Sequence, residues 1–205
     1  MPNSDAEKTK SNIVFLKPQQ VEAMRDVAHE GRQGRRDDAI ITLMYDTGLR
    51  RAELSGVDRE MLDLDDGTLT IPPSIQKSYP NNSEPETTTF QLDPDGSLRT
   101  VRTLRSHVDD LNDDTVALFP SRKSPRLTGK AINDAVKRAA QRAETRPFTK
   151  AGRGTPDEVT AHTLRHSVAW RMLRAMDDRT FYDVRNRLRH STIKTTEDSY
   201  DHFQT

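Results

Sequence analysis

The chain has 205 residues, 32 acidic and 32 basic side chains, and no cysteine. This length suits one ordinary domain, and the lack of cysteine excludes disulfides and thiolate metal sites. No signal peptide is visible, and no apolar run approaches the roughly 18 residues of a membrane-spanning helix, so we expect a cytoplasmic protein without a membrane partner.

Residues 1–13 form a predicted disordered polar tail, because they are charged and lack periodicity. A helix is predicted from Pro18, followed by a loop over Gly31–Gly34. The apolar run Ala39–Tyr45 behind two aspartates predicts a second helix, the most buried one, which ends before Gly48.

Alternating apolar residues around the turn Asp65–Gly67 predict a hairpin with strands near Glu60–Leu64 and Thr68–Pro72. Thr87–Leu92 is a third predicted strand, and a polar loop over Pro73–Glu86 precedes it. We therefore expect one small antiparallel three-stranded sheet.

The rest of the chain is mainly helical in pattern. Arg146–Pro156 is predicted to be a flexible basic loop, and Thr128 is the expected N-cap of a basic amphipathic helix. The predicted helices are Ser97–Leu111, Thr128–Glu144, a helix from Thr160 or His162 to Met176, Thr180–Leu188 and Thr192–Phe203.

The net charge of zero does not indicate a nucleic-acid partner, but the charges are unevenly distributed along the chain. Residues 122–153 hold ten Lys or Arg and two acidic residues, whereas residues 53–95 hold ten acidic residues and two basic ones. This asymmetry suggests one basic face, although a charged stretch taken alone is more often an ordinary solvated surface.

Two stretches carry side chains suited to phosphate chemistry, and the first follows the second predicted helix. Arg50 lies in a Gly-Leu-Arg turn, with Glu53 three residues later. Taken alone, this pattern fits a helix end with a surface salt bridge as well as it fits a functional arginine.

The second stretch contains His162 and His166, which have the spacing of two zinc ligands on a helix. Thr163 stands where a zinc hydrolase needs glutamate, and no third ligand is evident, so we expect no metal. His166 is interpreted as a buried or hydrogen-bonded structural histidine. Taken singly, His190 could cap a helix and Tyr200 could be an ordinary tyrosine that packs in the core.

The ordered set is more specific than its parts. It resembles the tyrosine recombinase (phage integrase) family from Val14 to Phe203 through three motifs: Gly48-Leu49-Arg50-x-x-Glu53-Leu54, His162-x-x-Arg165 and Leu188-Arg189-His190-x9-Tyr200. The resemblance implies a catalytic domain over residues 14–205, mainly α with a small antiparallel three-stranded β-sheet.

The resemblance also implies site-specific DNA cleavage and rejoining without a metal or any other cofactor. Tyr200 would attack the scissile phosphate and form a 3′-phosphotyrosyl intermediate. A tyrosine hydroxyl has a reference pKa of about 10, so it must be positioned and deprotonated. Arg50 and Arg165 would hold the non-bridging oxygens as a planar, charge-assisted clamp.

Four further residues take roles from the resemblance. His162 would hydrogen-bond the phosphate or accept the tyrosine proton, and His190 would donate to the phosphate. Lys77 would protonate the leaving 5′-oxygen, although the long loop around it makes this assignment depend on the alignment. Glu53 would support the site by orienting its cations.

Double-stranded DNA is the implied partner, with self-association on DNA, as in the family's tetrameric synapse, and a monomer when free. The basic segment is expected to contact the DNA backbone through Lys130, Lys137, Arg138, Arg142 and Arg153.

Two features depart from the family pattern. Arg189 stands where the family usually has glycine, and the N-terminal core-binding domain is expected to be missing, which would cost phosphate contacts. Two alternatives share the fold: type IB topoisomerase-like DNA relaxation and a DNA-binding protein without catalysis. The sequence leaves open whether Tyr200 acts in its own protomer or in a neighbour.

Overall fold

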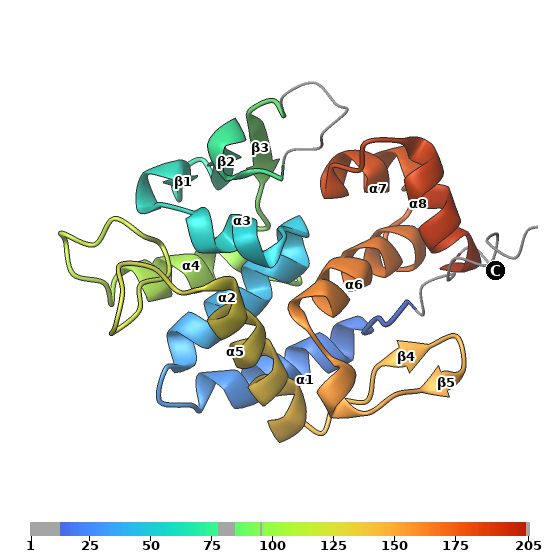
Figure 1. Ribbon diagram of the computed structural model, residues 1–205, viewed down its shortest axis with the longest axis horizontal. Helices are drawn as coiled ribbons and strands as arrows, with labels where there is room; N and C mark the ends of the chain where they lie inside the picture. The colour runs from blue at the N-terminus through green and yellow to red at the C-terminus, as the bar shows by residue number, and fades with distance from the viewer. Residues whose placement is uncertain (1–12, 78–84, 95, 204–205) are drawn as a thin grey trace, which may run out of the picture.

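The computed structural model describes residues 13–77, 85–94 and 96–203 (Figure 1). The predicted mainly α fold is confirmed, and each predicted helix has a counterpart. The α-helices are α1 Pro18–His29, α2 Gly34–Thr47, α3 Arg51–Gly56, α4 Thr100–Val108, α5 Gly129–Arg142, α6 Ala161–Arg174, α7 Phe181–Leu188 and α8 Ile193–Tyr200. Short 3-10 helices are η1 Arg59–Met61, η2 Pro73–Ile75, η3 Pro156–Glu158 and η4 Asp201–Phe203. Within the described ranges, no helix combines the length and the apolar character needed to cross a bilayer.

Helix α2 forms the centre of the fold and contacts α1, α4 and α6. Residues 40–45 are at most 1 % exposed. The helix begins at Gly34, within the stretch predicted as a loop, and ends at Gly48, whose φ of 69° is left-handed. A Cβ at Gly48 would lie 2.4 Å from Leu188 Cδ2, so glycine is needed both for the turn and for the approach of α7.

The predicted three-stranded antiparallel sheet is confirmed and lies at one edge of the molecule, beside α3 (Figure 1). Its strands follow the order β1 (Leu62–Asp63), β2 (Thr68–Ile71) and β3 (Thr88–Gln91). Leu69 on β2 lies opposite Phe90 on β3, and both side chains are buried. Strand β1 is shorter than predicted, because residues 59–61 form η1 instead.

The structure corrects the loop predicted over Arg146–Pro156, which contains a hairpin of β4 (Phe148–Thr149) and β5 (Gly152–Arg153). Phe15 N donates to Phe148 O over 3.0 Å, and Phe148 N donates to Phe15 O over 2.9 Å. The two rings stack with centroids 5.4 Å apart. The hairpin is therefore ordered by a segment far upstream, which a local pattern cannot reveal.

Threonine N-caps start the three helices that carry the C-terminal motifs. The hydroxyls of Thr160, Thr180 and Thr192 each accept a hydrogen bond from the backbone N–H three residues later. Helix α6 packs against α2 and α7, and α8 packs against α7 (Figure 1). The last predicted helix is α-helical only to Tyr200 and continues as η4, which leaves Tyr200 at the C-terminal end of α8.

Candidate active site

The turn between α2 and α3 holds Arg50 beside a buried carboxylate. Arg50 N donates to Glu53 Oε2 over 2.7 Å, and Arg50 Nη1 donates to Glu53 Oε1 over 2.9 Å. Burial alone would raise the pKa of Glu53, which is 1 % exposed. The charge of Arg189 and the hydrogen bonds and charge of Arg50 outweigh burial, so the pKa of Glu53 lies below its usual value. Glu53 is therefore ionised at neutral pH and fixes the Arg50 side chain.

Arg189 is the second cation on Glu53, and the sequence analysis did not include it in the site. Arg189 Nη2 donates to Glu53 Oε2 over 2.5 Å. Its backbone has φ 52° and ψ 51° and ends α7, so the left-handed turn is present with arginine in place of glycine, at a steric cost. The only sequence signal for this role is a cation directly before His190.

Helix α6 directs Arg165 into the interior, where the residue is 3 % exposed. Arg165 Nη1 donates to the carbonyl oxygen of Gly48, and Nη2 donates to that of Leu188. Burial and the nearby charge of Arg50 lower the pKa of Arg165 to about 10, so the guanidinium stays charged at neutral pH. These two bonds use two of its five N–H donors and join the ends of α2 and α7.

His162 and His190 belong to the same electrostatic cluster as the two arginines. Loss of surrounding water and the charges of Arg165 and Arg50 lower the pKa of both histidines, that of His190 to about 3. His162 is exposed, whereas His190 Nδ1 is hydrogen-bonded to the Thr196 hydroxyl over 2.9 Å. Both rings are therefore neutral at pH 7, and both lie close enough to the two arginines for their charges to lower the histidine pKa values.

Tyr200 joins this cluster from α8 of the same chain. Its ring stacks on His190, with centroids 6.0 Å apart and planes inclined by 15°. Burial raises the pKa of Tyr200 to about 12, although the charge of Arg165 acts in the opposite direction. The residue is 1 % exposed, so its hydroxyl is protonated and enclosed.

The hydroxyl of Tyr200 and Nδ1 of His166 are hydrogen-bonded over 2.8 Å. The sequence pattern predicted a buried or hydrogen-bonded structural histidine at position 166 and gave no sign of its contact with Tyr200. Burial and the cationic groups around it, Arg165 among them, lower the pKa of His166 to about 3. The rings of His162 and His166 lie edge to face at 4.3 Å. Among the described residues, no three His, Cys, Asp or Glu side chains are grouped to hold a metal ion.

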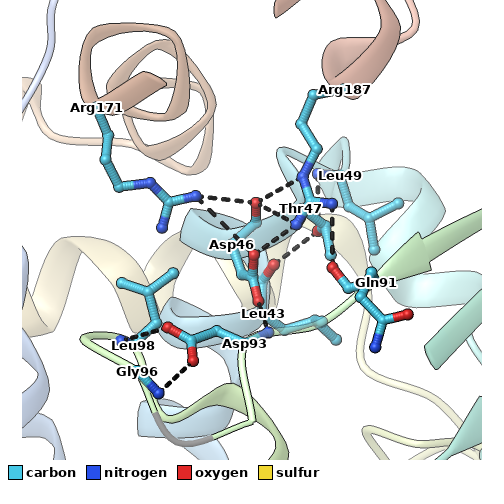
Figure 2. Close-up of polar contacts among 10 residues, drawn as sticks. All are labelled: Leu43, Asp46, Thr47, Leu49, Gln91, Asp93, Gly96, Leu98, Arg171 and Arg187. Atoms are coloured by element: carbon cyan, nitrogen blue, oxygen red, sulfur yellow. Dashed lines mark hydrogen bonds and ion pairs between the residues drawn. The ribbon is translucent and has the colours of Figure 1, made fainter. Parts of the chain in front are cut away.

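Asp46, four residues before Arg50, is a buried junction between the end of α2 and the segments around it (Figure 2). Its Oδ1 accepts a hydrogen bond from Arg187 Nη2 over 2.5 Å, and its Oδ2 accepts one from Asp93 N over 2.9 Å. Arg171 Nη2 donates to the Asp46 carbonyl oxygen over 3.3 Å. One acidic residue thus ties the end of α2 to α6, α7 and the segment after β3.

This junction reaches the cluster through α7, because Arg187 immediately precedes Leu188, whose carbonyl oxygen holds Arg165. On its other side lies a cavity of about 990 Å³ lined by residues of α1, β3 and α6, among others. None of the predicted catalytic residues lines this cavity. The arginine and histidine cluster is therefore separate from it.

Lys77 is exposed and stands directly before residues 78–84, which lie outside the described residues. Its role at the site therefore stays a prediction. The predicted loop over residues 78–84 stays a prediction as well.

Most of the predicted DNA-binding cations have partners within the chain. Three of them form ion pairs, and a fourth, Arg153, lies over the Phe148 ring at 3.9 Å. Ion pairs at the protein surface are weak, so the three paired cations can leave their acidic partners and bind DNA phosphates instead. The pairs are Lys130–Asp134 at 2.8 Å, Arg138–Asp37 at 3.3 Å and Arg142–Glu30 at 3.4 Å. Lys137, the fifth, is partly exposed.

The start of α5 borders the cluster more closely than its end does. Ala161 N, at the start of α6, donates to Asn133 Oδ1 over 3.0 Å. A Cβ at Gly129 would lie 3.4 Å from Arg51 Cγ, so the first turn of α5 lies beside the exposed Arg51. Arg51 is a second cation that the sequence analysis did not select, although it directly follows Arg50.

Comparison with known proteins gives this cluster a family. Residues 14–205 match the family model described as "Phage integrase family". "Tyrosine recombinase XerC" of Pseudomonas fluorescens is 33 % identical over 165 residues, which cover 80 % of this chain and 47 % of the relative. XerC of Bifidobacterium longum (strain DJO10A) is 30 % identical over 179 residues, 84 % of this chain and 45 % of the relative. The chain spans about half the length of the curated relatives it matches.

Solved structures share the fold. The crystal structure of XerA recombinase matches with a TM-score of 0.72 and 19 % identity, over 95 % of this chain and 61 % of that one. The Tn1549 transposon integrase, solved in complex with a circular intermediate DNA, matches with a TM-score of 0.71 and 17 % identity, over 95 % and 63 %. The fold is that of a tyrosine recombinase catalytic domain, and the chain belongs to the phage integrase family.

Proposed function

We propose that this chain cleaves and rejoins DNA at specific sites through a covalent bond between Tyr200 and a 3′-phosphate. The observation that carries the proposal is the Tyr200 ring stacked on His190, within electrostatic reach of the buried Arg165, in a single chain. The names of the curated relatives, tyrosine recombinases, support the same activity.

Two arginines are proposed to stabilise the charge that develops on the phosphate. In the cleavage step the Tyr200 oxygen bonds to phosphorus and the bond from phosphorus to the 5′-oxygen breaks. Arg50 and Arg165 are held by Glu53 and by backbone carbonyls before DNA arrives, so little reorganisation is needed as the negative charge increases. Attack by a 5′-hydroxyl on the phosphotyrosyl bond reverses the step and rejoins the strand.

The neutral histidines and the loop lysine complete the proposed site. His162, exposed at the start of α6, and His190, beside Tyr200, would hydrogen-bond the phosphate oxygens. Lys77 would give a proton to the leaving 5′-oxygen. Each of these groups acts on an atom of the scissile phosphodiester.

Access to Tyr200 requires a rearrangement, because the residue is 1 % exposed. Helix α8 is short, and its extensive contacts are those with α7 and η4. DNA binding is therefore proposed to move the side chains and segments that cover Tyr200 until the phosphate reaches its hydroxyl.

Double-stranded DNA is the proposed partner, and the start of α5 is the part of that helix nearest Arg50 and His162. Gly129 lies there beside the exposed Arg51, and Lys130 is the predicted DNA-binding cation in that first turn of α5. Strand exchange between two DNA sites needs more than one copy of the chain, so self-association on DNA is part of the proposal.

A library of nicked duplexes with randomised sequence tests the proposal without knowledge of the target. Cleavage near the nick releases a short strand, which prevents rejoining and traps a protein–DNA adduct. We expect adducts that survive denaturant, form in the presence of EDTA and yield the target sequence when the captured DNA is read.

Tyr200→Phe should abolish the adduct, and Arg165→Ala should reduce it strongly. Tyr182→Phe is the matched control, since Tyr182 lies on α7 with 62 % exposure, and it should react like the wild type. No adduct from the wild-type chain, or an adduct that persists in Tyr200→Phe, contradicts the proposal.

A further inference from the structure

The hydrogen bond between Tyr200 and His166 gives the proposed nucleophile a specific partner. The phenolic oxygen and Nδ1 are 2.8 Å apart, and the rings lie edge to face with centroids 5.6 Å apart. Tyr200 is closed off on its other sides by His190 and Phe203, whose rings both stack on it. The hydrogen bond therefore lies where solvent cannot remove the proton.

We propose that His166 accepts the proton of Tyr200 during strand cleavage and returns it during rejoining. This inference rests on the proposed function, because it names the base of the same reaction. In the balanced step, the phenolic proton moves to His166 Nδ1, the Tyr200 oxygen bonds to phosphorus, and the 5′-oxygen leaves with a proton from a separate acid. His166 touches the reacting atom and is thus a catalytic residue under this proposal.

The charges around His166 fit a base that acts only during attack. Its pKa is lowered to about 3 by burial and by its cationic surroundings, Arg165 among them, whereas that of Tyr200 is raised to about 12. The proton therefore stays on the phenol until phosphorus withdraws electrons from the oxygen. A bound phosphodiester also brings negative charge into this cationic cluster, which favours the protonated imidazole.

The groups that face His166 come from four segments of the chain. His162 and Arg165 lie on its own helix, His190 follows α7, and Tyr200 and His202 come from α8 and η4. His162 is exposed and its ring is 4.3 Å from that of His166. His162 therefore offers the side on which a proton held by His166 can be exchanged with water.

The first test needs no DNA. Nitrogen NMR of ¹⁵N-histidine-labelled protein at pH 7 reports which ring nitrogen of His166 carries hydrogen. We expect Nε2 to be protonated and Nδ1 to be a hydrogen-bonded acceptor, and the Nδ1 signal should move to the unbonded position in Tyr200→Phe. Hydrogen on Nδ1 in the wild-type protein would overturn the proposal, because that nitrogen could not receive the phenolic proton.

The second test uses a nicked duplex recovered from the adduct library, in single-turnover cleavage. Asparagine at 166 places a carbonyl oxygen where Nδ1 stands, so His166→Asn keeps the hydrogen-bond acceptor but cannot take a proton at neutral pH. We expect cleavage at least about 100-fold slower than in the wild type. His107→Asn is the matched control for loss of a buried histidine, since His107 bonds to the carbonyl oxygen of Leu118, and it should cleave at close to the wild-type rate.

Chemical rescue keeps the idea testable if His166→Asn folds poorly. His166→Ala leaves space for imidazole, and added imidazole should restore cleavage in proportion to its concentration. Wild-type cleavage rates in His166→Asn, or no rescue by imidazole in a folded His166→Ala protein, would show that His166 is not the base. Either result would leave the proposed function standing. Absence of any adduct from the wild-type chain removes the proposed function and this inference with it, so the two failures are distinguishable.

Discussion

Arg189 donates to the buried carboxylate of Glu53 over 2.5 Å while its own backbone lies in the left-handed region at φ 52°. Glycine would adopt that backbone without steric cost, but it would supply no cation. Because Glu53 also holds Arg50, the arginine at 189 helps to keep the carboxylate ionised beside a proposed phosphate ligand.

Substitutions at Arg189 separate the ion pair from the backbone strain. Arg189→Leu and Arg189→Gly both remove the cation from Glu53 and should lower stability at pH 7, but only leucine keeps the strained backbone. The leucine variant should therefore be less stable than the glycine variant by about 1 kcal/mol. Urea unfolding measures the difference, and equal stability of the two variants would show that this turn is unstrained.

Asp46→Asn tests the junction behind the site. The substitution leaves Arg187 and Arg171 without their buried counter-charge, so we expect a loss of stability of about 3 kcal/mol. Asp65→Asn is the control, because it removes the acid of an exposed pair with Arg105 at 3.2 Å, and such pairs contribute little. Denaturant unfolding of both variants at pH 7 gives the comparison, and a loss at Asp46 as small as that at Asp65 would be inconsistent with a supporting role.

Much of this arrangement follows from local signals in the sequence. Gly48 ends α2 as predicted, and Thr128 accepts a hydrogen bond from Ala131 N as the N-cap of α5. These features depend on residues within one helical turn. The convergence of Arg50, Arg165 and Tyr200 is different, because it was expected only from the resemblance to a family.

Other features depend on contacts between distant segments. The β4–β5 hairpin is ordered by Phe15, so the composition of residues 146–156 suggested only a loop. His166 looked structural because its partner, Tyr200, lies on another helix. Arg189 was treated as a departure from the family, because the acid that it meets is not near it in the sequence.

Lys77 can be tested as the proposed acid by changing the leaving group. A duplex with sulfur in place of the bridging 5′-oxygen releases a thiolate, which needs no proton to depart. Lys77→Ala should slow cleavage of the normal duplex about 100-fold or more and cleave the sulfur-containing duplex at close to the wild-type rate. The same replacement should not restore His166→Asn, since its defect is in the nucleophile. A lysine variant that stays slow on the sulfur-containing duplex would contradict the role of Lys77 as acid.

The position of the DNA can be tested through the salt dependence of non-specific binding. Each lost phosphate contact reduces the slope of log K against log salt by roughly 0.9. Lys130→Gln should show this reduction, because Lys130 lies at the end of α5 that borders the cluster. Arg142→Gln should show less, since Arg142 lies at the opposite end of α5. Fluorescence anisotropy with a labelled duplex over a range of KCl gives both slopes, and a larger change for Arg142 would place the DNA along the other end of the helix.

The neutral histidines should make the protein sensitive to mild acid. The pKa of His166 and that of His190 are about 3 in the folded protein, whereas an unfolded histidine has a pKa of about 6.5. Above that value both states are neutral, and as pH falls below it only the unfolded state gains protons, so stability falls from pH 6.5 toward 3. Each of the two residues should cost about 2 kcal/mol at pH 5 relative to pH 7.

Urea unfolding at pH 7 and pH 5 measures this loss, and two variants assign it. His166→Gln removes one of the titrating groups, so the difference in stability between the two pH values should shrink by about 2 kcal/mol. His29→Gln replaces an exposed histidine at the end of α1 and should leave the difference as in the wild type. If both variants keep the wild-type difference in stability between pH 7 and pH 5, then His166 has the same pKa in the folded and unfolded protein. A histidine with an unshifted pKa would not be the neutral proton acceptor proposed for Tyr200.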